Sequence, residues 1–220
     1  FEALKKLSIE VAQGEIYGLL GSNGAGKSTT INILLGFLDP NSGEAFINGI
    51  NTASEKLIAR KSIGYIPENV NLYPYLTGIE NLDYFCKLAG KRYNREKLKE
   101  VLLECGLDLI SMDKKLNTYS KGMRQKVGIA IALAKEANVY LLDEPASGLD
   151  PLASTELSSI LKKLSNNGAA ILMASHDIFR IRETCDRIGI LKNGELVKEI
   201  DTANVSTKEL ENIYIEYMKD

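Results

Sequence analysis

Hydrophobic and polar positions alternate at the start of the chain and then gather into short apolar runs. Leu7, Ile9 and Val11 are separated by polar residues, and this period of two predicts an antiparallel β-strand within residues 1–11. Short continuous apolar runs are typical of buried parallel strands. Such runs occur at 15–20, 62–67, 139–142 and 169–174. Further strands are expected at 44–47, before an Asn48-Gly49 turn, and in a hairpin of 187–191 with 195–200.

A helical period of apolar residues takes over between about residue 70 and residue 135. Asn94 is the expected N-cap of a helix that Gly106 ends, and Ser120 is expected to begin a second helix. Other helices are expected at 30–37, 154–164 and 178–185, and after Ser206, where Glu209 completes a capping box. Strands that alternate with helices predict an α/β fold. We therefore expect an α/β core with an antiparallel β edge and an inserted helical part.

Composition and charge narrow the classes of partner. The 220 residues include 27 Lys plus Arg against 29 Asp plus Glu, a balance that argues against a nucleic-acid-binding surface. The three cysteines lie far apart and the chain has one His, so we expect reduced thiols and no zinc site. The apolar stretches fall well short of the ~20 residues of a membrane-spanning helix, so we expect a soluble chain. The chain opens on Phe1 instead of Met, and we interpret Phe1 as a truncation point.

A glycine-rich loop between the apolar run at 15–20 and the helix expected at 30–37 matches G-x-x-x-x-G-K-[ST]. The loop consists of Gly21, Ser22, Asn23, Gly24, Ala25, Gly26, Lys27, Ser28 and Thr29. Glycines allow consecutive backbone N–H groups to turn toward a polyphosphate, and the following helix presents its positive end to the same anion. Lys27 would reach the β- and γ-phosphates, and the Ser28 hydroxyl would ligate Mg²⁺.

Two acidic residues and a histidine supply the remaining parts of phosphoryl-transfer chemistry. Asp143 and Glu144 follow the buried run at 139–142, where Asp143 would hold Mg²⁺ and Glu144 would polarise the attacking water. His176 follows the run at 169–174 and could hydrogen-bond a γ-phosphate. A lone His is more often structural, so both interpretations of His176 stay open at this point.

These residues resemble a family, the ATP-binding subunits of ABC transporters, and the resemblance covers essentially the whole chain. The family's motifs occur in order: Walker A at 21–29, the Q-loop position at Glu68, the signature loop at 120–125, Walker B at 139–144, the D-loop at 147–150 and the H-loop at His176. Glu68 stands where Gln is usual, and Lys121 replaces a Gly of the commonest signature.

The resemblance implies a P-loop NTPase fold that binds ATP and Mg²⁺ and works as a homodimer or heterodimer. One domain of 1–220 would comprise an α/β core of 1–69 and 136–220 and a helical insertion of 70–135 that carries the signature loop. Lys27, Glu144 and His176 would be catalytic, and Ser28, Asp143 and Glu68 would surround the metal. Ser120 and the Gly122 amide would contact the partner's γ-phosphate, and Asp150 the partner's phosphate loop. Ser120 could equally serve as a helix cap only.

The resemblance also implies a membrane partner, because these ATPases power a separate transmembrane permease from the cytoplasmic face of the membrane. The motifs are most similar to those of the ABC-2-type exporter group, so we expect export. Tyr73, Pro74 and Tyr75 would line the groove that receives the permease, or would simply pack the insertion against the core. The alternative function is a soluble ABC ATPase that takes part in iron–sulfur assembly or remodels a complex.

Overall fold

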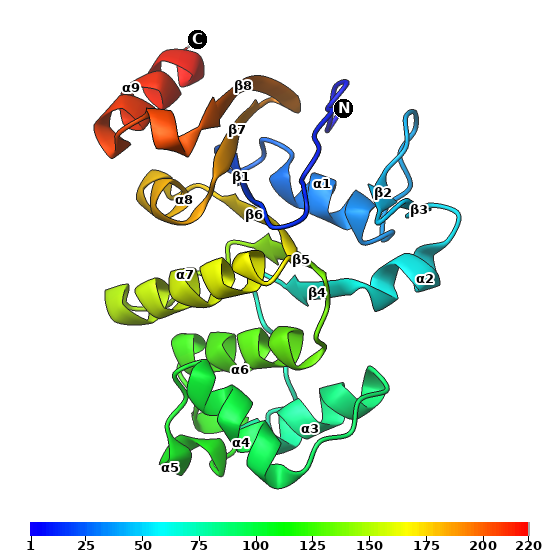
Figure 1. Ribbon diagram of the computed structural model, residues 1–220, viewed down its shortest axis with the longest axis vertical. Helices are drawn as coiled ribbons and strands as arrows, with labels where there is room; N and C mark the ends of the chain where they lie inside the picture. The colour runs from blue at the N-terminus through cyan, green and yellow to red at the C-terminus, as the bar shows by residue number, and fades with distance from the viewer. Residues whose placement is uncertain (220) are drawn as a thin grey trace.

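A six-stranded sheet forms the centre of the computed structural model, which describes residues 1–219 (Figure 1). The strand order is β4-β5-β6-β1-β7-β8, and neighbours pair in parallel from β4 to β7, whereas β8 is antiparallel to β7. The strands are β1 (Ile16–Leu20), β4 (Ile63–Ile66), β5 (Val139–Asp143), β6 (Ala170–Ser175), β7 (Arg187–Lys192) and β8 (Glu195–Asp201). A separate antiparallel pair consists of β2 (Phe46–Ile47) and β3 (Ile50–Asn51).

Helices cover both faces of the sheet, which explains why its strands are continuous apolar runs. Tyr17 and Leu19 of β1 pack with α1 (Lys27–Leu34) and α2 (Lys56–Lys61), whereas Ile16 and Leu20 pack on the opposite face with α7 (Pro151–Asn166) and α8 (Ile178–Thr184). Successive side chains of a strand point to opposite faces, so both sets must be apolar when both faces are buried. The core is therefore divided by the sheet into two clusters.

The chain between β4 and β5 forms a helical lobe at the bottom of Figure 1. It consists of α3 (Gly78–Leu88), α4 (Arg95–Glu104), α5 (Leu109–Met112), a 3-10 turn (Leu116–Thr118) and α6 (Lys121–Ala134). Four caps come from side chains that accept backbone N–H groups: Thr77 from Glu80, Asn94 from Lys97, Asp108 from Ser111 and Ser120 from Met123. The caps at Asn94 and Ser120 confirm the starts predicted for these helices.

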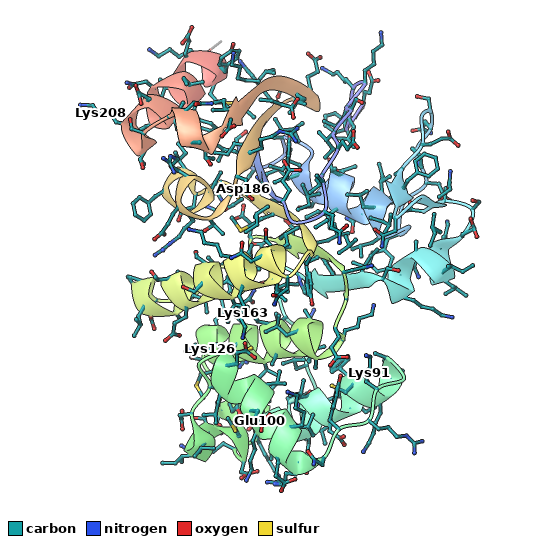
Figure 2. All side chains as sticks on the ribbon, in the orientation of Figure 1. Lys91, Glu100, Lys126, Lys163, Asp186 and Lys208 are labelled. Atoms are coloured by element: carbon teal, nitrogen blue, oxygen red, sulfur yellow. The ribbon has the colours of Figure 1, made fainter. Side chains whose placement is uncertain are left out.

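Polar bridges fasten the helical lobe to the rest of the molecule. Lys163 projects from α7 toward the lobe (Figure 2), and its Nζ lies 2.7 Å from Glu104 of α4. Lys135, which follows α6, donates to the backbone oxygens of Arg60 and Ile63 at 2.5 Å. Burial lowers the pKa of Lys135. The exposed Lys163 pair contributes little to stability, whereas the partly buried Lys135 satisfies carbonyls that would otherwise lack a donor.

The strand predicted within residues 1–11 is wrong. Of the described residues, 1–15 contain no strand, although Leu7, Ile9 and Val11 are half-buried against the apolar cluster around Tyr17. Alternation correctly indicated which side chains face the core, but a ladder also needs a neighbouring strand edge. The backbone of this segment instead meets the sheet at Lys5, whose N–H donates to the Gly194 carbonyl at 2.8 Å.

The other predicted elements are present with shifted ends, whereas the helix α2 at Lys56–Lys61 was not predicted. Helix α1 begins at Lys27 instead of residue 30, and α7 begins at Pro151 because Asp150 caps it by accepting the Ala153 N–H. The C-terminal helix α9 (Thr207–Met218) begins at the predicted capping box of Ser206 and Glu209. A 3-10 turn (Thr202–Asn204) links β8 to α9. No helix among the described residues is long and apolar enough to cross a membrane.

Candidate active site

The glycine-rich loop lies between the buried strand β1 and helix α1. Gly24 and Gly26 have φ angles of 83° and 112°, which favour glycine. A Cβ added at Gly26 would lie 2.6 Å from a methyl group of Leu4, whereas one added at Gly24 would meet nothing within 4 Å. Gly26 is thus enclosed by protein, and Gly24 faces open space. The loop forms a cradle that is open at Gly24.

Lys27 is the first residue of α1, and its ammonium group is almost buried beneath the loop. The side chain is 5% exposed, and Nζ donates to the carbonyls of Gly21 at 2.7 Å and Ser22 at 3.1 Å. Glu144 lies 3.8 Å from Nζ. Burial lowers the pKa of Lys27, and the nearby carboxylates oppose that shift. The structure therefore places a poorly solvated cation at the floor of the loop, where an anion would bind.

A hydroxyl and a carboxylate meet beside Lys27. Asp143 is the last residue of β5 and is 8% exposed, and the Ser28 side chain lies close enough to oppose the effect of burial on the pKa of Asp143. Burial raises the pKa of Asp143, and the charges of Glu144 and Glu68 act in the same direction. Glu68 itself is exposed, just beyond the end of β4.

This donor set fits a magnesium ion that is shared with a polyphosphate. Magnesium bound in this way takes one or two protein oxygens and obtains its other ligands from phosphates and water. Among the described residues no group of three or more His, Cys, Asp or Glu could hold a metal ion. Ser28 and Asp143 together supply one hydroxyl and one carboxylate. These two oxygens match the one or two protein ligands that such a magnesium ion takes.

Glu144 follows β5 directly and is held by three neighbours. Its φ of 47° is unusual for a residue with a side chain, and its N–H donates to the Ala174 carbonyl of β6 at 2.9 Å. One carboxylate oxygen accepts from the Ser175 hydroxyl at 2.9 Å, and the other lies 2.7 Å from Nδ1 of His176. The parallel pairing of β5 with β6 brings these strand ends together. Glu144 is thus oriented beside the cradle.

Ser175 is the site residue that the sequence analysis missed. It ends β6, adjoins His176, and also accepts the Asp177 N–H at 3.1 Å. The available signal was its position, because a polar residue at the carboxyl end of a buried parallel strand faces the edge where ligands bind. The hydroxyl orients Glu144 while the turn it caps carries His176.

The remaining predicted residues lie in a second groove. Ser120, Gly122 and Asp150 line it together with Met123, Lys126, Gly148, Leu149 and Ala153. A Cβ at Gly122 would lie 2.9 Å from the Gly148 carbonyl, and the Lys121 ammonium donates to the Ser147 hydroxyl at 2.8 Å. No hydrogen bond or ion pair found in residues 1–219 joins Ser120, Gly122 or Asp150 to the Lys27 cluster. Ser120 does act as a cap, as one of its two interpretations required.

Aromatic side chains gather at the start of the helical lobe. The Tyr73 ring packs edge-on against Tyr84 with centroids 4.9 Å apart, and it also contacts Phe85. The backbone of Tyr73 is anchored by the fully buried Asn81. Tyr73 nevertheless remains 47% exposed and Tyr75 78% exposed. The cluster therefore combines packing within the lobe with an exposed aromatic surface.

Comparison with known proteins identifies relatives along nearly the whole chain. The family model described as "ABC transporter" matches residues 4–147, and a model described as "AAA domain, putative AbiEii toxin, Type IV TA system" matches residues 115–181. The chain is 42% identical over 200 residues to the uncharacterized ABC transporter ATP-binding protein YdbJ of Bacillus subtilis, a match that covers 90% of this chain and 64% of YdbJ.

Two further matches extend the comparison to transport and to structure. The bacitracin transport ATP-binding protein BcrA of Enterococcus faecalis is 35% identical over 207 residues, which cover 92% of this chain and 65% of BcrA. The dimeric structure of a post-hydrolysis state of the ATP-binding cassette MJ0796 bound to ADP and Pi has a TM-score of 0.84 and 31% identity, over 91% of this chain and 90% of that chain. The chain spans just under two thirds of the length of YdbJ and BcrA.

Proposed function

Since this chain belongs to the ABC transporter family of ATP-binding proteins and has its P-loop ATPase fold, we propose that it binds Mg-ATP and hydrolyses ATP to power transport. The single observation that carries the proposal is the meeting of Lys27, Asp143, Glu144 and His176 beside the glycine-rich loop. In this proposal the catalytic unit is one domain of 1–220, with the α/β core at 1–69 and 136–220 and the helical insertion at 70–135.

Each residue of the cluster has a distinct task in this proposal. The loop amides and Lys27 bind the phosphates, because a buried ammonium with backbone carbonyls as its main partners gains from an anionic ligand. Ser28 and Asp143 would hold Mg²⁺, whose charge would neutralise that of the phosphates, and Glu68 would act near the same ion. Glu144 accepts the proton of the attacking water, and His176 and Ser175 hold its carboxylate in place.

Substitution of Lys27 tests the phosphate site directly. Lys27→Ala is expected to weaken Mg-ATP binding by roughly a hundredfold or more, because the cation at the floor of the loop is lost. Lys61→Ala is the matched control, since Lys61 is exposed at the end of α2. Isothermal titration calorimetry measures both affinities, and Mg²⁺-dependent phosphate release measures turnover. Unchanged ATP affinity in Lys27→Ala would contradict the assignment.

The second groove supports a dimer as the active form. Ser120, Gly122 and Asp150 lie apart from Lys27 within one chain, so contact with nucleotide would require a second chain placed head to tail. The solved structure of the related MJ0796 cassette is dimeric. We expect Glu144→Gln to form a dimer when Mg-ATP is added, as size-exclusion chromatography with light scattering would detect. A monomer with ATP bound would show that closure needs another subunit or that the groove has a different role.

The proposed partner is a membrane permease that this ATPase serves from the cytoplasmic face. The name of BcrA refers to bacitracin transport, and the linearmycin resistance ATP-binding protein LnrL of Bacillus subtilis is 36% identical over 196 residues. These names favour export. The exposed rings of Tyr73 and Tyr75 offer the permease an aromatic surface. Co-purification with a membrane protein would support this partner, whereas co-purification with a soluble scaffold would support a non-transport ABC ATPase.

A further inference from the structure

The turn between β7 and β8 contacts the outer side of the glycine-rich loop. Asn193 and Gly194 form this turn, with φ angles of 49° and 83°, as in a tight two-residue hairpin. The Gly194 N–H donates to the Ala25 carbonyl at 2.9 Å, and the Gly194 carbonyl accepts the Lys5 N–H at 2.8 Å. One residue of the turn therefore joins the phosphate loop to the N-terminal segment through its backbone alone.

The three segments meet so closely that side chains are excluded. A Cβ at Gly194 would lie 2.7 Å from the Ala3 carbonyl oxygen, and a Cβ at Gly26 would lie 2.9 Å from the same oxygen. At the other end of the loop, a Cβ at Gly21 would lie 2.5 Å from the Leu191 carbonyl oxygen of β7. Hairpin and loop are packed backbone to backbone at both ends.

The bond to Ala25 determines the direction of a neighbouring amide. In a trans peptide the C=O of one residue and the N–H of the next point in opposite directions. Gly194 holds the Ala25 carbonyl on the hairpin side, so the Gly26 N–H points away from the hairpin. In residues 1–219 no protein acceptor is found for the Gly26 N–H. The orientation suits a loop whose N–H groups bind phosphate oxygens.

We propose that Gly194 is a positioning residue for the phosphate site, because its N–H anchors the Ala25 carbonyl and thereby keeps the Gly26 N–H directed at bound polyphosphate. The inference rests on the proposed ATP-binding function and adds the β7–β8 turn to it. The turn does not touch the nucleotide. It acts on affinity through the peptide plane between Ala25 and Gly26.

The chain contains a matched control in a second Asn-Gly hairpin turn. Gly49 follows Asn48 between β2 and β3 with a φ of 76°, and a Cβ there would meet nothing within 4 Å. Gly49→Ala and Gly194→Ala therefore carry a similar backbone strain, and only Gly194→Ala forces the turn away from its neighbours. A methyl group at Gly194 would meet Ala3 and Leu4 of the N-terminal segment, so the turn must shift and its N–H moves away from the Ala25 carbonyl. A difference between the two variants therefore reports the displacement of this turn.

The test measures binding of MgADP by calorimetry and the ¹H–¹⁵N resonance of Gly26 in the full chain. Gly194→Ala is expected to bind MgADP roughly tenfold to a hundredfold more weakly, the effect of one lost hydrogen bond to a charged group. It is also expected to lose the shift of the Gly26 resonance on binding. Gly49→Ala should keep both the shift and an affinity within about twofold of the wild type.

A second pair of variants covers the case in which Gly194→Ala does not fold. Insertion of one glycine after Asn193 displaces the Gly194 N–H without adding a side chain, and insertion after Asn48 is its control. Near-wild-type MgADP affinity in folded Gly194→Ala, or in the folded variant with a glycine inserted after Asn193, would overturn the inference. Equal losses of MgADP affinity in the variants of the two hairpins would also overturn it. Failure of the wild-type chain to bind MgADP would instead overturn the proposed function itself.

Discussion

Replacement of Glu144 by glutamine tests the chemistry of the site with little change of shape. Glu144→Gln keeps an oxygen that can accept from the Ser175 hydroxyl, which lies 2.9 Å from the carboxylate. It removes the negative charge that lies 3.8 Å from Lys27 and 2.7 Å from His176. The group that would take a proton from water is lost, while the phosphate cradle retains its residues.

The expected effects on turnover and on stability differ widely in size. Loss of a positioned general base lowers the rate about 10²- to 10⁴-fold, which raises the barrier by about 3–5 kcal/mol. The free energy of unfolding is expected to change by less than about 2 kcal/mol, because the lost attraction to Lys27 is offset by the lower cost of burying a neutral side chain. ATP affinity is retained, since a negative charge beside the phosphates is removed.

The assay combines phosphate release, ATP binding and thermal denaturation. Glu136→Gln is the control, because Glu136 is an exposed acid that pairs with Lys91 at 2.6 Å, outside the cluster. We expect the control to turn over ATP within about twofold of the wild type. Turnover at the wild-type rate in Glu144→Gln would refute the role of Glu144 as the base. A loss of ATP binding in parallel with turnover would place Glu144 in nucleotide binding instead.

Three further predictions concern charge and stability. Burial raises the pKa of Asp143, so the folded chain prefers the protonated form and loses stability as the pH rises from the ordinary value of 3.8 through the raised pKa. Asp143→Asn should therefore raise the melting temperature of the nucleotide-free chain at pH 7 but not at pH 3, while abolishing Mg²⁺-dependent hydrolysis; equal effects at both pH values would contradict this. Asn81→Leu should cost about 2–4 kcal/mol, because the amide pairs with the N–H and C=O of Tyr73 in the buried lobe, and urea unfolding measures the loss. Asn94→Ala removes the cap that accepts the Lys97 N–H and should cost about 1 kcal/mol; an unchanged urea midpoint would show that the cap is dispensable.

Local patterns predicted most of the elements, because caps, turns and buried strands depend on neighbours in sequence. Ser120 and Ser206 cap helices at the predicted positions, and Asn193 and Gly194 form the predicted turn. The same reasoning failed for residues 1–11. Alternation there reports burial of one face, and a strand also requires a partner edge that lies elsewhere in the chain.

The glycine-rich loop is the part of the site that the sequence by itself determined, because nine consecutive residues, from the end of β1 into the first turn of α1, contain the whole motif. The family and the fold class follow from that loop and the ordered motifs behind it.

Only the tertiary structure decided how the separated parts meet. The sheet order β5-β6-β1 brings the carboxyl ends of three parallel strands to one edge, so Asp143, Ser175 and the loop after β1 become neighbours across more than a hundred residues. The contact of Gly194 with Ala25 arises in the same way. Such pairings depend on packing between distant segments, and no local preference of the chain encodes them.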